Sequence, residues 1–298
     1  MADLKTLRNR IKGVKNIQKI TQAMKVVAAS KLRKARIAAE ESRLFSDATR
    51  SSFFNSIKSI EQSDDISLGF LNNSKSTKTL LVVVASDRGL CGGLNNNLVK
   101  YCIAKATEIN ESGYECKLFL IGKKVVDAIK SKAPELILSE NEGFSSRKIE
   151  VEKVTDFKNQ ILQIVEEQNF DSVRLIYTGF ESAISQNIID QLLIGSKYEL
   201  LSEFGYDSDA NSLNVDFEYE PNKAEVILAL FDYYMLSGLN QSFYESFASE
   251  QGSRMTAMDN AVKNCKELTD KLTLVYNRTR QAKITTELVE IISAVESL

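Results

Sequence analysis

The C-terminal segment constrains this sequence more than any other feature, because Glu218 to Leu298 predicts a single helix. Its one proline, Pro221, stands near the start, where a helix tolerates proline. Apolar or small side chains recur at the spacing of a coiled coil, at Met258, Ala261, Cys265, Leu268, Leu272 and Val275. At about 1.5 Å per residue the helix would be roughly 110 Å long. A compact globule of 298 residues is narrower than that, so the helix needs a partner along part of its length.

A second heptad pattern occupies residues 1–60, which contain one glycine, Gly13, and no proline. The positions that repeat at three or four residues are Leu4, Leu7, Ile11, Val14, Ile17, Thr21, Met24 and Ala28. After Val26 the apolar positions are mostly alanines, whose small side chains let two helix backbones approach closely. We therefore predict a second long helix at the N-terminus.

The middle of the chain has a different pattern. Residues 61–78 are polar and predict a linker, and residues 79–85 (TLLVVVA) predict a strand buried on both faces of a parallel sheet. We expect an inserted α/β domain over residues 79–215. Its further predicted elements are helices 94–110, 123–132, 155–168 and 186–192, strands 116–121, 136–138 and 172–178, and an antiparallel edge strand 213–219.

The predicted fold class is α/β, with a long antiparallel coiled coil of the two terminal segments and a Rossmann-like domain inserted between them. The inserted domain, residues 79–215, sends the chain out along the helix of residues 1–60 and back along that of residues 218–298. The second helix is longer, so its tip is expected to protrude or to be wrapped by another protein. The apolar residues of that tip are Ile284, Leu288, Ile291, Ile292, Val295 and Leu298.

The composition excludes several chemistries. The chain has no histidine, which rules out Ser-His-Asp and Cys-His catalysis and histidine metal sites. The four cysteines show no CxxC spacing, so reduced thiols are expected. No apolar run approaches the roughly 20 residues of a membrane span, and the N-terminus resembles neither a signal peptide nor a transit peptide.

The turn at residues 86–93 (SDRGLCGG) follows the first strand, where α/β folds bind phosphates. It lacks both the G-x-G-x-x-G pattern and the Lys-Ser/Thr of a P-loop, and Cys91 has no histidine to activate it. We interpret it as a tight turn whose glycines supply positive φ, with Asp87 and Arg88 as candidate contacts to a neighbouring subunit. The acidic cluster near residues 207–220 lacks the EF-hand pattern and is interpreted as a solvated face. We thus expect no catalytic residue, cofactor or metal.

The first helix is strongly basic, with eleven lysines and arginines and one acidic residue, Asp3, among residues 1–36. Part of this charge fits an ordinary solvated helix face, but the imbalance favours an acidic partner. One alternative is a basic coiled-coil protein that binds nucleic acid or acts as a scaffold; the segment lacks aromatic residues for base stacking. Another is an α/β enzyme with coiled-coil arms, which would require nucleotide binding by residues 79–215.

Four motifs in order along the whole chain resemble the gamma subunit of F-type ATP synthases. They are residues 20–31 (ITQAMKVVAASK), 86–95 (SDRGLCGGLN), 249–258 (SEQGSRMTAM) and 276–291 (YNRTRQAKITTELVEI). One departure is Ser293-Ala294, where the family usually has Gly-Ala. Serine favours a helix more than glycine does, so we expect no loss of function.

The resemblance implies a non-catalytic central shaft that couples proton flow through the membrane rotor to ATP synthesis. It implies contacts with alpha and beta subunits, the epsilon subunit and the c-subunit ring, without nucleic acid, at the cytoplasmic side of a bacterial inner membrane. Residues matched to the gamma–beta coupling contact are Met24, Arg254, Gln281, Thr285 and Glu287. The basic run suits acidic loops of beta subunits, which makes Lys19 and Lys25 candidate subunit contacts beside Asp87 and Arg88.

Overall fold

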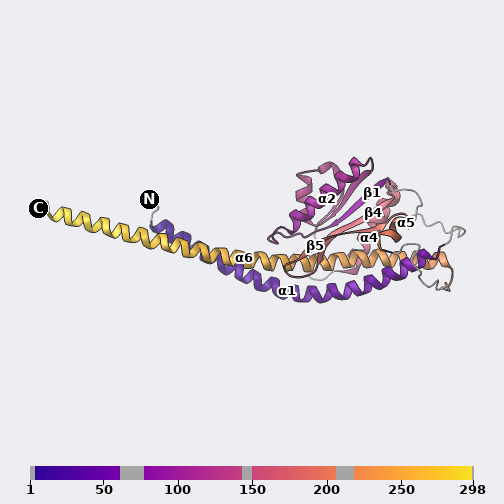
Figure 1. Ribbon diagram of the computed structural model, residues 1–298, viewed down its shortest axis with the longest axis horizontal. Coiled ribbons are helices and arrows are strands. Elements are labelled where there is room, and N and C mark those ends of the chain that lie inside the picture. Colours follow the sequence, from indigo (N-terminus) through magenta and orange to yellow (C-terminus); the bar gives the residue numbers. More distant parts are fainter. Residues whose placement is uncertain (1–3, 61–76, 143–149, 206–217, 297–298) are drawn as a thin grey trace. The chain divides into compact units, whose positions relative to one another are not determined.

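The computed structural model describes residues 4–60, 77–142, 150–205 and 218–296. Two long helices, α1 (Leu4–Lys58) and α6 (Lys223–Glu296), enclose the other elements in the sequence (Figure 1). The chain forms two compact units, and each long helix contributes to both. The helix-pair unit comprises residues 1–30 and 254–298, and the sheet unit comprises residues 31–253.

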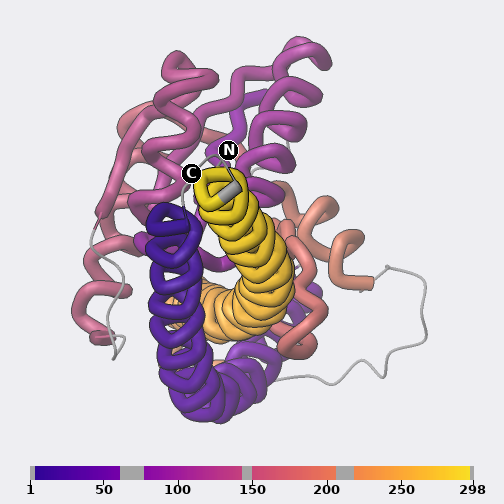
Figure 2. Tube along the Cα trace, turned by 90° about the vertical axis from the view of Figure 1, so that its left-hand side faces the viewer, coloured from indigo at the N-terminus to yellow at the C-terminus, as the bar shows by residue number. Residues whose placement is uncertain are grey.

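The two long helices run antiparallel. In the helix-pair unit Lys25 forms an ion pair with Asp259 at 2.5 Å, and in the sheet unit Arg43 contacts Glu245 at 3.0 Å. The residue with the higher number on α1 thus pairs with the residue with the lower number on α6, as in an antiparallel pair. Figure 1 shows the first turns of α1 beside α6 at a point before α6 reaches its C-terminal end, and Figure 2 shows the same two helices seen along their length. The predicted pairing of the terminal segments is therefore confirmed.

Helix α6 begins five residues later than predicted, at Lys223 instead of Glu218. Asn222 lies immediately before the helix, and its side-chain oxygen accepts a hydrogen bond from the Glu225 backbone N–H at 2.9 Å. Asparagine is a favoured N-cap because it satisfies a backbone donor that the first turn leaves unpaired. Pro221 thus precedes the cap and does not lie in the first turn.

The sheet unit contains a five-stranded sheet of order β3-β2-β1-β4-β5. Strands β1 (Lys78–Val84), β2 (Glu115–Ile121), β3 (Ile137–Asn141) and β4 (Ser172–Phe180) are parallel, and β5 (Gln186–Ile194) is antiparallel to β4. The central strand β1 is buried on both faces, as its β-branched run predicts.

Helices cover both faces of this sheet. Alternate residues of β1 point in opposite directions, so Leu80, Val82 and Val84 pack with the end of α1, with α4 (Val151–Gln168) and with α6. Leu81 and Val83 pack instead with α2 (Leu94–Glu111) and α3 (Lys123–Lys130). The inserted domain is consequently a three-layer α/β arrangement in which α1 and α6 belong to one layer.

The prediction of a helix over residues 186–192 is wrong, because these residues form β5. The apolar residues Ile188, Ile189, Leu192 and Leu193 are spaced as on a helix, but pairing with β4 determines the structure. This is tertiary context overriding a local pattern. The edge strand predicted at residues 213–219 falls almost entirely outside the described residues. In the described sheet, β5 is the antiparallel strand at the edge.

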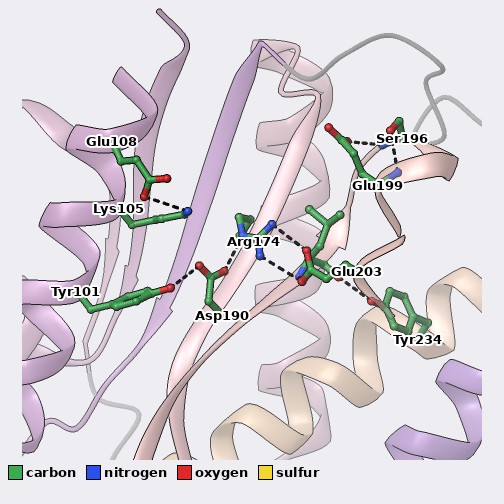
Figure 3. A network of polar contacts seen from close by, with 10 residues as sticks. Tyr101, Lys105, Glu108, Arg174, Asp190, Ser196, Glu199, Glu203 and Tyr234 are labelled. Carbon is green, nitrogen blue, oxygen red and sulfur yellow. Dashed lines mark hydrogen bonds and ion pairs between the residues drawn. The ribbon is translucent and has the colours of Figure 1, made fainter. Parts of the chain in front are cut away.

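A polar network joins the β4–β5 edge to two helices (Figure 3). Arg174 on β4 contacts Asp190 of β5 at 2.6 Å and Glu203 of α5 (Lys197–Glu203) at 3.0 Å. Tyr101 of α2 donates a hydrogen bond to Asp190 at 2.8 Å. Burial of Tyr101, followed by this bond to Asp190, raises the pKa of its phenol to about 12. The network fixes α2 and α5 relative to the antiparallel edge.

Candidate functional site

The inner face of the helix-pair unit keeps a seven-residue repeat, although part of it lies one residue later than predicted. On α1 Leu7, Val14 and Ala28 are buried, while Ile17 is 53% exposed and Gln18 is partly shielded. On α6 Met258 and Thr269 are buried, and the partly shielded positions beyond Met258 include Ala261, Val262, Cys265, Leu272, Tyr276 and Thr279. On α6 the buried and partly shielded positions repeat at intervals of seven residues, in the two sets Met258, Cys265, Leu272, Thr279 and Val262, Thr269, Tyr276. This seven-residue repeat is that of a coiled coil.

Three residues of the predicted contact faces are wrong. Ile17, Leu268 and Val275 were expected to face the partner helix, but all three are exposed. The shielded positions lie one residue later, at Gln18, Thr269 and Tyr276. The outer face of the helix-pair unit consequently carries apolar side chains, which also include Ile20, Val26, Val27 and Leu274.

The C-terminal part of α6 continues past the N-terminal end of α1 (Figure 1). Every described side chain from Gln281 to Val295 is exposed. The large apolar ones are between 49% and 67% exposed, and they are Ile284, Leu288, Val289, Ile291, Ile292 and Val295. An exposed apolar surface of this kind marks a binding site.

The five residues matched to the coupling contact do not form one cluster. Met24 is partly shielded, in the turn of α1 that holds the Lys25–Asp259 ion pair, and Arg254 is buried. Gln281 lies 22 residues beyond Asp259 on α6, about 33 Å further along the helix axis. The structure therefore separates a first group, Met24 and Arg254, from a second group near the tip.

In the tip group, Gln281 and Thr285 lie one turn apart on the same face of α6. The Thr285 hydroxyl donates a hydrogen bond to the Gln281 backbone oxygen at 3.0 Å. Glu287 forms an exposed ion pair with Lys283 at 3.7 Å. Gln281 and Thr285 on one face of α6, and the Glu287 carboxylate on another, therefore offer polar contacts on more than one side of the helix.

The two lysines proposed as subunit contacts differ in their surroundings. Lys19 is exposed, whereas the Lys25 ammonium donates a hydrogen bond to Asp259 at 2.5 Å. Hydrogen bonds from Lys25 and then Lys263 lower the pKa of the Asp259 carboxyl. Part of the basic charge of α1 is therefore compensated within the chain, a contact that sequence reasoning missed.

The turn after β1 is organised by its own side chains. The Asp87 carboxylate accepts the Lys123 backbone N–H at 2.9 Å, at the start of α3, and Ser86 donates to the Arg88 backbone oxygen at 2.9 Å. The predicted positive φ occurs at Gly92, at 59°, and also at the exposed Leu90, at 63°. Asp87 thus has a role within the chain whether or not it also contacts a subunit.

A polar cleft of 720 Å³ lies among α1, β4, β5 and α6 in the sheet unit. Its lining charges are largely paired: Arg43 contacts Glu245, and Arg50 contacts Asp47. Within the described residues, no group of three or more cysteines and carboxylates has a geometry suited to a metal ion. The same part of the chain contains no helix long and apolar enough to cross a bilayer.

Sequence reasoning also missed a row of polar residues on α6. Glu245, Ser249 and Ser253 follow one another at intervals of four residues, so they share one face of the helix. Each bonds a backbone group outside α6, near the carboxyl ends of β1 and β4. The spacing was visible in the sequence, but its backbone partners were not.

Comparisons with known proteins agree with these features. The family model for ATP synthase matches residues 3–298. The ATP synthase gamma chains of Rhodospirillum rubrum and Rhizobium etli are each 38% identical to this chain, and the match covers 100% of this chain and 100% of each relative. That of Pelagibacter ubique is 36% identical with the same coverage.

Solved structures show the same fold. A chain of the Tetrahymena thermophila mitochondrial ATP synthase central stalk and c-ring is 27% identical, with a TM-score of 0.61 over 81% of this chain and 99% of that one. A chain of the Euglena gracilis OSCP/F1/c-ring assembly has a TM-score of 0.68 at 19% identity, over 99% of this chain and 94% of its own. The chain therefore belongs to the ATP synthase gamma-chain family, as a non-catalytic subunit of the central stalk of an F-type ATP synthase.

Proposed function

We propose that the helix-pair unit turns inside a ring of alpha and beta subunits and that its faces set the state of each beta subunit. The observation that carries this proposal is the exposed end of α6, where the described side chains from Gln281 to Val295 are open to solvent. An apolar collar supplied by other subunits would cover this surface. Few directional bonds would then have to break at each step of rotation.

The surface of the helix pair differs from side to side, as coupling to several beta subunits requires. α1 presents many lysines and arginines, while exposed Ile17, Val27 and Leu274 add apolar areas. A partner that meets these surfaces in turn experiences different interaction energies, and only such differences shift a conformational equilibrium. Met24 with Arg254, and Gln281 with Thr285 and Glu287, are proposed as two separate coupling contacts.

The sheet unit is proposed to face the epsilon subunit and the polar loops of the c-subunit ring, with Asp87 and Arg88 as candidate contacts. The similar Tetrahymena chain belongs to a central stalk and c-ring, and the similar Euglena chain to an assembly of OSCP, F1 and c-ring. The similar gamma chains from bacteria support a peripheral position on the cytoplasmic side of a bacterial inner membrane. Lys19 is proposed to contact acidic loops of beta subunits.

Co-purification with a tagged chain in mild detergent tests the assembly. The expected result is recovery of alpha and beta subunits in excess over the tagged chain, together with epsilon and the c-ring. Recovery of the chain without alpha and beta would contradict the proposal.

The coupling role of Met24 is tested by Met24→Lys, which adds a cation to a turn of α1 that already contains Lys25. In inverted membrane vesicles we expect ATP-driven proton pumping per ATP hydrolysed to fall about fivefold or more, the usual size of a lost coupling. Met24→Leu, which keeps an apolar side chain of similar volume, is the matched control. Undiminished pumping by Met24→Lys would exclude this contact.

A further inference from the structure

The polar row on α6 lies where α/β folds ordinarily bind their ligands. β1 leads into α2 on one face of the sheet, whereas α4, which precedes β4, covers the other face. The parallel pair β1–β4 is therefore the topological switch point of the sheet. In open α/β sheets the ligand crevice lies beyond the carboxyl ends of such strands. Here the polar groups at those ends are bonded by side chains of α6.

Three bonds tie the row to these strand ends. The Phe180 backbone N–H at the end of β4 donates to the Glu245 carboxylate at 3.3 Å. The Ser249 hydroxyl donates to the Thr178 backbone oxygen at 3.1 Å. The Ser253 hydroxyl donates to the Cys91 backbone oxygen, in the turn after β1, at 2.6 Å. Two of the motifs that resemble the gamma family, residues 86–95 and 249–258, are therefore bonded to each other.

Small residues bring the backbones close at the same place. A Cβ atom added to Gly252 would lie 3.3 Å from the Ala183 Cα atom and 3.4 Å from the Phe180 ring. A Cβ added to Gly179 would lie 2.8 Å from Ile189 and 3.2 Å from the Glu245 carboxylate. Both glycines therefore stand at tight contacts, and Glu245 and Ser249 are at most 3% exposed.

We propose that Glu245, Ser249 and Ser253 are positioning residues that hold α6 in register with the sheet. A force applied to the sheet unit is then transmitted to α6 without the helix sliding along the sheet. This inference rests on the proposed function. Hydrogen bonds weaken steeply with misalignment, whereas apolar contacts are non-directional. A row of directional bonds along the helix axis therefore adds resistance to slippage beyond that of the packed apolar core.

The experiment compares serine-to-alanine changes on the same helix in the assembled, membrane-bound complex. The test variant carries Ser249→Ala and Ser253→Ala. The matched control is Ser242→Ala, because Ser242 is as buried as Ser249 but donates to the Leu239 backbone oxygen of its own helix at 2.7 Å. The readout is ATP-driven proton pumping per ATP hydrolysed, normalised to the amount of assembled complex.

We expect the double variant to lose about fivefold in pumping per ATP, while Ser242→Ala matches the wild type. Ser253→Thr keeps the hydroxyl and should retain coupling where Ser253→Ala does not. A merely structural role would lower the yield of complex without changing this ratio. Equal ratios for the double variant and Ser242→Ala overturn the inference.

Two further outcomes of this experiment would also test the inference. If the double variant does not assemble, Ser253→Ala alone is compared with Ser242→Ala, and equal ratios again overturn the inference. If the wild-type chain neither assembles with alpha and beta subunits nor supports pumping, the proposed function fails. Normal coupling by wild type and by both alanine variants leaves the proposed function intact and rejects only the positioning role.

Discussion

The helix-pair unit and the sheet unit bury their apolar side chains very differently. In the sheet unit, both faces of the five-stranded sheet are covered by helices, and strands such as β1 are buried throughout. In the helix-pair unit, the buried apolar residues of the described part are Leu7, Val14, Ala28 and Met258. The exposed large apolar residues there are far more numerous, from Ile17 on α1 to Val295 on α6.

The difference shows that the two units depend on different sources of stability. Burial of apolar area contributes about 25 cal/mol per Å², and the sheet unit gains it within the chain. The helix-pair unit leaves much of its apolar area in water, so we expect other subunits to contribute to its full stabilisation. Variants that separate stability of the isolated chain from performance in the complex test this comparison.

The largest expected effect is that of removing residues 281–298. Their described side chains are exposed, so the urea midpoint of the isolated chain should change little, while coupling in the assembled complex should be lost. Removal of the last four residues alone should be tolerated in both assays. Full coupling by the deep truncation would show that the tip does not act through its partners.

Phe243→Ala is expected to have the largest effect on the isolated chain. Phe243 is fully buried where α6 packs in the sheet unit, and such a change typically costs about 3–5 kcal/mol. The counterpart is Val275→Ala, at an exposed position of the helix-pair unit, with an expected change within about 0.5 kcal/mol. Urea unfolding measures both, and similar losses would contradict the comparison.

Thiol reactivity sharpens the comparison further. Burial raises the pKa of the Cys116 thiol to about 12, and burial also raises that of Cys102. Thiolates are the reactive form, so both should resist iodoacetamide in the folded chain. Cys265 in the helix-pair unit is only partly shielded and should react about tenfold faster or more. Mass spectrometry of the labelled peptides measures the three rates. Faster labelling of Cys102 or Cys116 than of Cys265 would contradict the comparison.

The smallest expected effect comes from Lys25→Gln, which removes the partly exposed ion pair with Asp259. Because the folded-state pKa of Asp259 is lowered, the pair's contribution is present above the unfolded pKa of about 3.9. That contribution is lost as the pH falls through the folded value. The urea midpoints of variant and wild type should therefore differ slightly at neutral pH and converge in strong acid. Lys19→Gln, at an exposed lysine, is the control, and a gap that widens in acid would refute the pair's role.

Much of the fold could be predicted because its signals are local. The heptad spacing of both termini and the β-branched run before the turn SDRGLCGG predicted the paired helices and the central strand correctly. β5 was mistaken for a helix because its pairing with β4 is a non-local contact. The shielded faces were displaced at Ile17, Leu268 and Val275, because these residues were chosen for their apolar side chains, whereas the neighbouring Gln18, Thr269 and Tyr276 keep the seven-residue repeat.

The site was less predictable than the fold. A resemblance to known motifs made Met24 and Gln281 candidate coupling contacts, but their separation along the helix pair follows from the register of two helices and not from either sequence segment. Ser249 and Ser253 stood inside a quoted motif without an assigned role. Their partners are backbone atoms of Thr178 and Cys91, which carry no side-chain signal that a sequence pattern could reveal.

Helix α6 runs without a break from Lys223 to Glu296 and is shared by both units. A loop within it would act as a joint in which rotation of one end could dissipate. A continuous backbone ladder offers no such joint, so deformation must spread over many turns as gentle bending. We therefore expect a load on one end of α6 to be shared by many residues and not concentrated at a single hinge.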